Sequence, residues 1–150
     1  LGKMDEQGLG NVSICPETMG KMNQMGTLDE VLELCKIDDR LIPTIDFGHL
    51  NSRGLGSLNS AEDFEEIIET MHKELGERRA KSFHCHFSKI QYTKGGEKKH
   101  LTFEDKEYGP NFEPFAQVMK KYSLTPVIIC ESAGTQAEDA LAMKRIWERV

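Results

Sequence analysis

The sequence predicts an α/β protein built from four successive βα units, and two observations lead to this prediction. Four short apolar runs, several rich in β-branched or aromatic residues, have the character of strands: residues 12–15, 41–45, 82–87 and 127–130. They alternate with four segments whose apolar residues recur at helical spacing: residues 28–37, 61–75, 112–122 and 136–150. This alternation favours a parallel sheet, either doubly wound or part of a (β/α)₈ barrel.

Each expected helix also begins with residues suited to cap it. Capping-box pairs precede three of the helices: Thr27 with Glu30, Ser60 with Asp63, and Thr135 with Glu138. Asn111 is suited to cap the remaining one. Between the units, residues 51–59 and 93–110 are predicted as loops that are long enough to form a binding face.

Four units are half of what a complete barrel needs, since a (β/α)₈ barrel takes about 250 residues and eight strands. We therefore expect residues 1–150 to be a single domain with two unpaired strand edges and an open apolar face. Such a chain should self-associate or pair with a missing N-terminal half.

Composition narrows the classes of protein that remain. Hydrophobic residues make up 38% of the chain and charged residues 29%, as in a globular protein. A net charge of −6 argues against binding of nucleic acid through the overall charge of the protein, although a local basic strip or bound metal would supply positive charge at one place. No apolar run approaches the roughly 20 residues of a membrane span, and residues 1–10 lack the apolar core of a signal peptide. The cytoplasm is the expected compartment.

The four cysteines form no C-x-x-C pair, so neither a zinc ribbon nor a thioredoxin-like site is indicated. Each lies in an apolar segment, and we expect buried free thiols. They are Cys15, Cys35, Cys85 and Cys130.

An acid or a histidine stands where each expected strand ends. Glu17 follows the first strand, Asp46 the second and Glu131 the fourth, while the third carries His86. The carboxyl ends of parallel strands share one edge, so these side chains should converge there. Three carboxylates would repel one another without a cation, and the mixed O/N set suits Zn²⁺, Mn²⁺ or Mg²⁺. Each residue taken alone could be a helix cap or a solvated loop residue.

The other histidines allow two interpretations. His84 shares a strand face with His86 but lies deeper, where we expect a hydrogen-bonded core residue. His72 should face solvent. His100 is either a surface residue or a ligand that acts with His49. Four lysines of its loop either are solvated or contact phosphates: Lys94, Lys98, Lys99 and Lys106.

At these positions the chain resembles the endonuclease IV family, within the wider superfamily of xylose isomerase-like barrels. The resemblance lies in residues 14–18 (ICPET), 45–49 (IDFGH), 86–89 (HFSK) and 128–132 (IICES). Their order and spacing look like the second half of that barrel, from about Val12 onward. The resemblance implies the C-terminal half of a (β/α)₈ TIM barrel, with its N-terminal half absent from this chain.

The resemblance also implies an activity, because in that family three zinc ions cleave the phosphodiester 5′ to an abasic site in DNA. Glu17 would bridge two metals, and Asp46, His86 and Glu131 would complete the second metal's shell. Glu131 would also help to activate the attacking water. Two histidines that hold the first metal belong to the N-terminal half.

For the third metal, the resemblance assigns His49 and His100 as ligands. The family places an aspartate two residues before the second of these histidines, and this chain has Lys98 there. The third site would then need a substitute among the nearby acids: Glu97, Glu104 or Asp105.

Three functions are compatible with these residues. The first is endonuclease IV-like hydrolysis at abasic DNA, as part of DNA repair. The second is a sugar isomerase or epimerase on the same scaffold, which would need only the metal at Glu17, Asp46, His86 and Glu131, and which the lysine at position 98 favours somewhat. The third is a half-barrel without catalytic activity.

Overall fold

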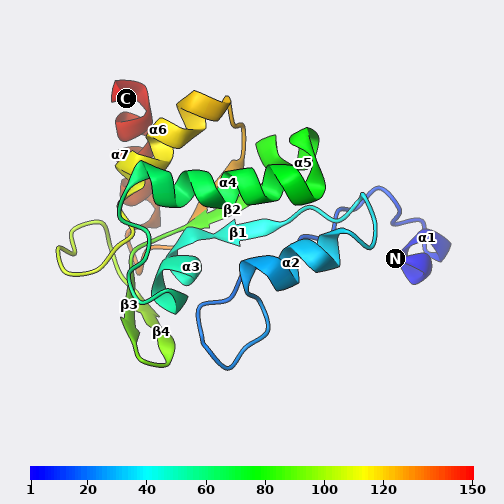
Figure 1. Cartoon of the computed structure of the whole chain (residues 1–150), viewed down its shortest axis with the longest axis horizontal. Helices are drawn as coiled ribbons and strands as arrows, with labels where there is room; N and C mark the ends of the chain where they lie inside the picture. Colours follow the sequence, from blue (N-terminus) through cyan, green and yellow to red (C-terminus); the bar gives the residue numbers. More distant parts are fainter.

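The computed structural model describes residues 1–150 as an α/β arrangement with three parallel strands and a separate hairpin (Figure 1). In chain order the elements are α1 (Gly2–Glu6), α2 (Leu28–Cys35), β1 (Thr44–Asp46), α3 (Phe47–Arg53), α4 (Ala61–Leu75), α5 (Glu77–Lys81), β2 (His84–Phe87), β3 (Ile90–Thr93), β4 (Gly96–His100), α6 (Phe112–Tyr122), β5 (Val127–Cys130) and α7 (Gln136–Arg149). The predicted α/β fold with parallel strands is confirmed.

The parallel sheet has the strand order β1-β2-β5, and its register aligns Asp46 with His86. The predicted first strand at residues 12–15 is wrong as a regular strand. Ile14 of that segment and Glu17 just after it make only isolated parallel bridges to the β1 side, to Leu41 and Thr44 respectively. The segment lies at the edge of the sheet, where an outer partner would be needed to complete a ladder.

The two predicted long loops contain secondary structure, so those predictions are wrong in part. Helix α3 starts directly after β1 and takes residues 47–53, because Asp46 Oδ1 accepts a hydrogen bond from His49 N (2.8 Å) and caps it. The loop predicted at 93–110 contributes β4, which pairs with β3 in an antiparallel hairpin. Gly96 adopts a positive φ of 86° at the turn, a conformation that glycine tolerates.

The predicted helices occur close to their expected positions, but two of their caps differ. The capping box of Thr27 and Glu30 forms, and Asp63 accepts a hydrogen bond from Ser60 N (2.8 Å). At α7, Thr135 Oγ1 donates to the Asp139 carboxylate (2.8 Å) and does not form the predicted capping box with Glu138. The same carboxylate accepts a hydrogen bond from Phe103 N in a neighbouring loop, which holds it in place. Asn111 makes no side-chain cap at α6.

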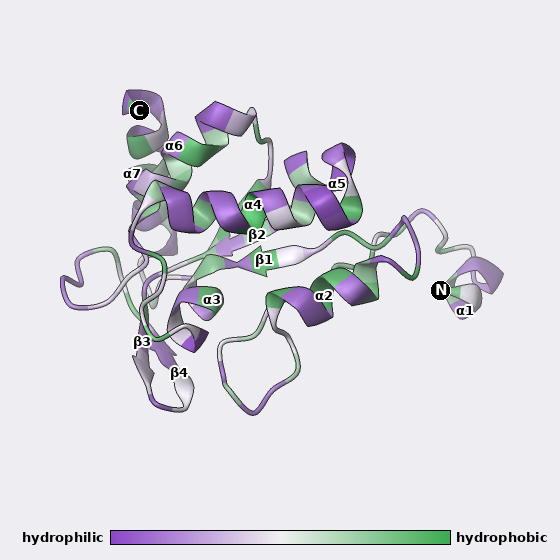
Figure 2. Ribbon diagram, in the orientation of Figure 1, coloured by the Kyte–Doolittle hydropathy of each residue, from purple (hydrophilic) through white to green (hydrophobic).

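One face of the sheet packs against the helices, and the other stays open. Side chains alternate along β2 and β5, so Cys85 and Phe87 are buried while Val127 and Ile129 remain 61% and 44% exposed. Hydrophobic and hydrophilic residues alternate along α4 as the ribbon winds, which supplies the apolar face that the sheet needs (Figure 2).

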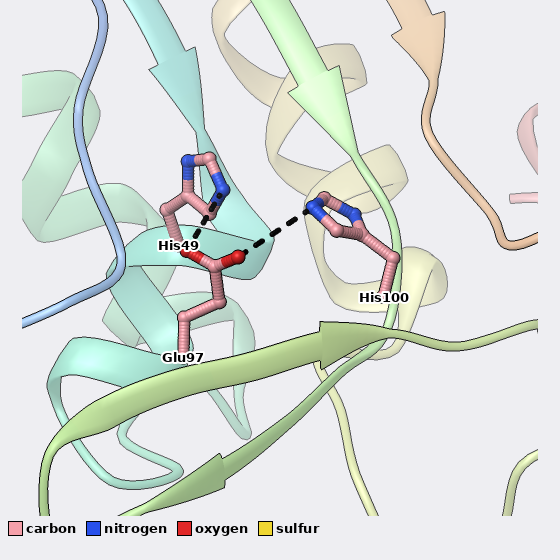
Figure 3. Close-up of side chains that lie close together, drawn as sticks. All are labelled: His49, Glu97 and His100. Atoms are coloured by element: carbon pink, nitrogen blue, oxygen red, sulfur yellow. Dashed lines mark ion pairs between the residues drawn. The ribbon is translucent and has the colours of Figure 1, made fainter.

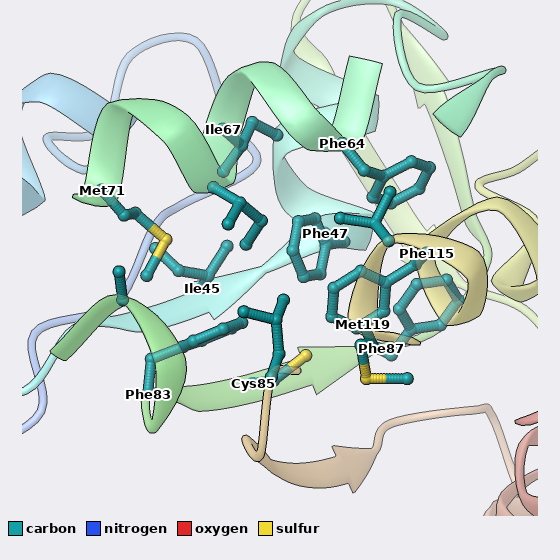
Figure 4. Close-up of a cluster of buried hydrophobic side chains, with 14 of the residues drawn as sticks. Ile45, Phe47, Phe64, Ile67, Met71, Phe83, Cys85, Phe87, Phe115 and Met119 are labelled. Atoms are coloured by element: carbon teal, nitrogen blue, oxygen red, sulfur yellow. The ribbon is translucent and has the colours of Figure 1, made fainter. Parts of the chain in front are cut away.

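Phe47 lies at the centre of the core (Figure 4). Its ring centroid is 4.3 Å from that of Phe115 on α6 and 5.2 Å from that of Phe64 on α4. Phe47 directly follows Asp46, so the packing of this ring fixes the beginning of α3 against two helices.

The structure tests the predicted burial of the cysteine thiols and the predicted absence of a membrane span. All four cysteines are free, and Cys35 and Cys85 are buried as expected. Cys15 is exposed, contrary to the prediction, because the edge segment that carries it has no neighbour on its outer side. None of the helices combines the length and apolar composition that crossing a bilayer requires.

Candidate metal centre

Four predicted ligands meet at the carboxyl ends of the parallel strands. Ligand atoms of these residues all lie within 4.8 Å of one another, and the group is here named the carboxylate cluster: Glu17, Asp46, His86 and Glu131. His86 Nδ1 is 3.0 Å from Glu17 Oε1 and 3.3 Å from Glu131 Oε1. The parallel register explains the convergence, since each residue lies near the carboxyl end of a chain segment that points to the same edge.

Asp46 is fully buried at the base of this cluster. Its Oδ1 caps α3, whereas its Oδ2 has no hydrogen-bond partner. Burial raises the pKa of the Asp46 carboxyl to about 6; His49 opposes this shift, and the charges of Glu131 and Glu17 add to it. An unpartnered buried carboxylate oxygen beside two other acids is costly, and a divalent cation would remove that cost.

Glu17 and His86 influence each other in the same cluster. Burial acts to raise the pKa of Glu17, but the hydrogen bond from His86 and the charges of His86 and His49 lower it overall. The pKa of His86 is raised, chiefly by its hydrogen bond to Glu17. The raised pKa favours a proton on His86 when no metal is bound, and that proton would neutralise part of the charge that a metal otherwise balances.

A second group forms beside the first, and it is here named the histidine cluster: His49, Glu97 and His100 (Figure 3). His49 Nε2 is 3.5 Å from Glu97 Oε2, and His100 Nε2 is 3.9 Å from Glu97 Oε1. Two imidazoles and one carboxylate, with room for a further ligand, are typical of catalytic zinc sites.

Hydrogen bonds hold both imidazole rings in this orientation. His49 Nδ1 donates to the carbonyl oxygen of Thr18 (2.8 Å), which orients the ring so that Nε2 faces Glu97. His100 Nδ1 lies 2.8 Å from the hydroxyl of Ser88, a fully buried residue, and its Nε2 likewise faces Glu97. Partners of this kind fix the tautomer and angle of metal-binding histidines. The sequence alone indicates no role for Thr18 or Ser88, because their contacts depend on loop geometry.

The two clusters adjoin each other at His49. Its Nδ1 is 3.2 Å from Asp46 Oδ2 and 3.6 Å from Glu17 Oε1, while its Nε2 faces Glu97. The six residues predicted as ligands therefore gather in one region, and Glu97 is the acid that joins them.

The remaining sequence predictions have mixed outcomes. Of the three possible substitutes for the missing aspartate, Glu104 is exposed, and Asp105 Oδ1 accepts hydrogen bonds from the backbone of its own turn. His72 is exposed, as expected. His84 is half-buried against His86, with ring centroids 5.1 Å apart. It makes no side-chain hydrogen bond, so the expected bonded core histidine is wrong, because the sheet face that carries it is open.

Comparisons with known proteins give two findings. Residues 4–147 match a family model described as a xylose isomerase-like TIM barrel. The chain is also 35% identical over 144 residues to an uncharacterized protein of Methanocaldococcus jannaschii. That alignment covers 96% of this chain and 51% of the relative, so the chain spans about half the length of the protein it matches.

Proposed function

Because this chain belongs to the xylose isomerase-like TIM barrel family, we propose that it forms the metal-binding half of an endonuclease IV-like enzyme. The reaction is hydrolysis of a phosphodiester bond at an abasic site in DNA, with zinc as the expected metal. The family includes both endonuclease IV and isomerases, so the choice between them depends on the site.

The observation that carries this choice is the histidine cluster. An isomerase needs only the metal of the carboxylate cluster, and the lysine at position 98 argued for that alternative. The lysine at position 98 no longer favours the isomerase, because Glu97 replaces the missing aspartate. Carboxylate oxygens of Glu97 lie within 4 Å of both His49 and His100. Two adjacent ligand sets support a multi-metal site, which is suited to clamping a phosphate from two sides.

The residues present fit divalent metal, since the orphaned Asp46 Oδ2 lies among three other ligand groups. Glu17, Asp46, His86 and Glu131 would hold one ion, and His49, Glu97 and His100 another. The bound metal would supply positive charge to the phosphate oxygens and promote deprotonation of the attacking water.

The protein's own groups complete the chemistry. The Glu131 side chain is 33% exposed and 3.3 Å from His86, so its carboxylate can reach a water and accept its proton. Asp46 is inaccessible and serves as a fixed ligand. Thr18 and Ser88 keep the two imidazoles aimed at Glu97.

The missing portion of the barrel is part of the proposal. The exposed inner positions of β5, and the outer side of the edge segment that carries Ile14, would contact further strands. These strands come either from an N-terminal half, as the length of the relative suggests, or from a second copy of this chain.

The test is a nicking assay on a DNA duplex with one abasic site. This chain and the full-length relative are each incubated with chelator, with zinc or with manganese, and an intact duplex serves as the substrate control. We expect a metal-dependent nick beside the abasic site. Glu131→Gln should abolish it, whereas Glu138→Gln, the same change at an exposed position of α7, should not. Absence of cleavage by either protein with any metal would reject the proposal, and ketose turnover with one bound metal would favour the isomerase.

A further inference from the structure

Four lysines gather on two neighbouring segments beside the histidine cluster. They are here named the lysine surface: Lys21, Lys94, Lys98 and Lys99. The first lies in the loop of residues 18–27 and the others on the β3–β4 hairpin, and all four are exposed. Main-chain contacts join the two segments. Lys21 forms an isolated antiparallel β-bridge with Gly96, and Met22 N donates to Gly95 O (3.0 Å).

None of these four ammonium groups pairs with a carboxylate, although the chain carries a net charge of −6. Lysines on the outer helices behave differently. Lys81 pairs with Glu77 (2.7 Å) and Lys121 with Glu65 (2.8 Å). A group of uncompensated cations in an acidic protein creates a local positive potential that attracts an anionic partner.

The loop that carries Lys21 is held firmly against the rest of the site. Arg53, at the end of α3, donates from Nη1 to the carbonyl oxygens of Met19 (3.2 Å), Lys21 (2.8 Å) and Gln24 (3.1 Å). Glu97 N in turn donates to Gly20 O (3.0 Å). The main-chain positions of the lysine surface are thus fixed before any partner binds, which reduces the entropy that binding would cost.

We propose that the lysine surface binds the phosphate backbone of the nucleic acid, an inference that rests on the proposed function. The four ammonium groups project from separate segments into solvent and do not converge on one buried pocket. Lysines act as flexible point charges, which suits successive phosphates of an extended strand better than one small sugar phosphate. The surface lies beside Glu97 and therefore orients the strand across the metal centre without reading its sequence.

The test measures binding of a short DNA duplex without an abasic site, in the presence of chelator, over a range of salt concentrations. Two double variants remove charges from the surface: Lys98→Gln with Lys99→Gln, and Lys21→Gln with Lys94→Gln. The matched control is Lys73→Gln with Lys144→Gln, at positions whose side chains are 82% and 70% exposed on other helices. Each surface variant should weaken binding and reduce the slope of log Kd against log salt by about 2, whereas the control should leave it unchanged.

Either of two results would overturn the proposal. One is an unchanged salt slope in both surface variants while thermal melting shows them folded. The other is that polyglutamate binds as tightly as DNA, which would indicate an acidic protein as partner. Binding without metal involves no cleavage, so failure of the nicking assay alone would count against the proposed function and not against this surface.

Discussion

Glu97 and His100 stand three residues apart on β4, yet they turn to the same side, with His100 Nε2 3.9 Å from Glu97 Oε1. In a regular strand, residues at this spacing face opposite sides. A β-bulge explains the difference, because Gln91 pairs with Lys99 and Tyr92 with Glu97, which leaves Lys98 as the extra residue. The bulge thereby brings an acid at an unexpected spacing into the histidine cluster.

Exchanging the acid with the bulge residue tests this explanation. In the double variant Glu97→Lys with Lys98→Glu, composition and net charge are unchanged, but the carboxylate moves to the exposed position. We expect binding of the histidine-cluster metal to weaken by at least about 10-fold, as measured by isothermal titration with zinc. Lys98→Gln alone should bind normally, and normal binding by the exchanged variant would contradict the role of the bulge.

The position of the bulge is a feature that the sequence alone did not predict, whereas the main elements of the fold were predicted. The parallel α/β order followed from the apolar periodicity, and the carboxylate cluster followed from acids and a histidine at the ends of strands. Glu97 could be named only as one of three candidates, because whether a strand contains a bulge depends on pairing with another strand. Helix α3 was missed for a related reason, since its residues have no helical stripe and Phe47 and the Asp46 cap determine its position.

Ser88 should control the affinity of the histidine cluster through His100. Ser88→Ala removes the hydroxyl that lies 2.8 Å from His100 Nδ1, so the ring loses its fixed angle. Loss of such a partner typically weakens metal affinity by about 10- to 100-fold. Zinc titration should show this loss for one metal while the metal at the carboxylate cluster binds as before. Ser88→Thr retains a hydroxyl and should recover much of the affinity; equal weakening of both metals would instead indicate general unfolding.

The buried Asp46 carboxyl should make the metal-free protein less stable at neutral pH than in mild acid. Its pKa is raised to about 6 in the folded state from the ordinary aspartate value of 3.8, so the folded state holds this proton more tightly than the unfolded chain does. This contribution to stability is complete below the unfolded pKa and is lost as pH rises through about 6. The loss amounts to at most about 3 kcal/mol.

Denaturation of chelated protein at about pH 5 and about pH 7.5 measures this effect. Asp46→Asn keeps an oxygen that can cap α3 but has no charge to bury, so the variant should gain stability relative to the wild type as pH rises. Added zinc should restore the wild type at the higher pH and have less effect on the variant. An identical pH dependence in both proteins would exclude Asp46 as the cause.

The open inner face should drive association of the isolated chain. Val127 and Ile129 on β5 are exposed on a strand whose outer edge has no partner, and unpaired apolar edges favour strand addition or face-to-face packing. Light scattering over a range of concentrations should show species larger than one chain. Val127→Lys with Ile129→Lys should shift the protein toward monomer. The matched control is Ile37→Lys with Leu141→Lys, which alters apolar residues that are 72% and 46% exposed outside the sheet. If the control variant dissociates the protein equally well, or if the wild type is monomeric at every concentration, then the inner face is not the surface that drives association.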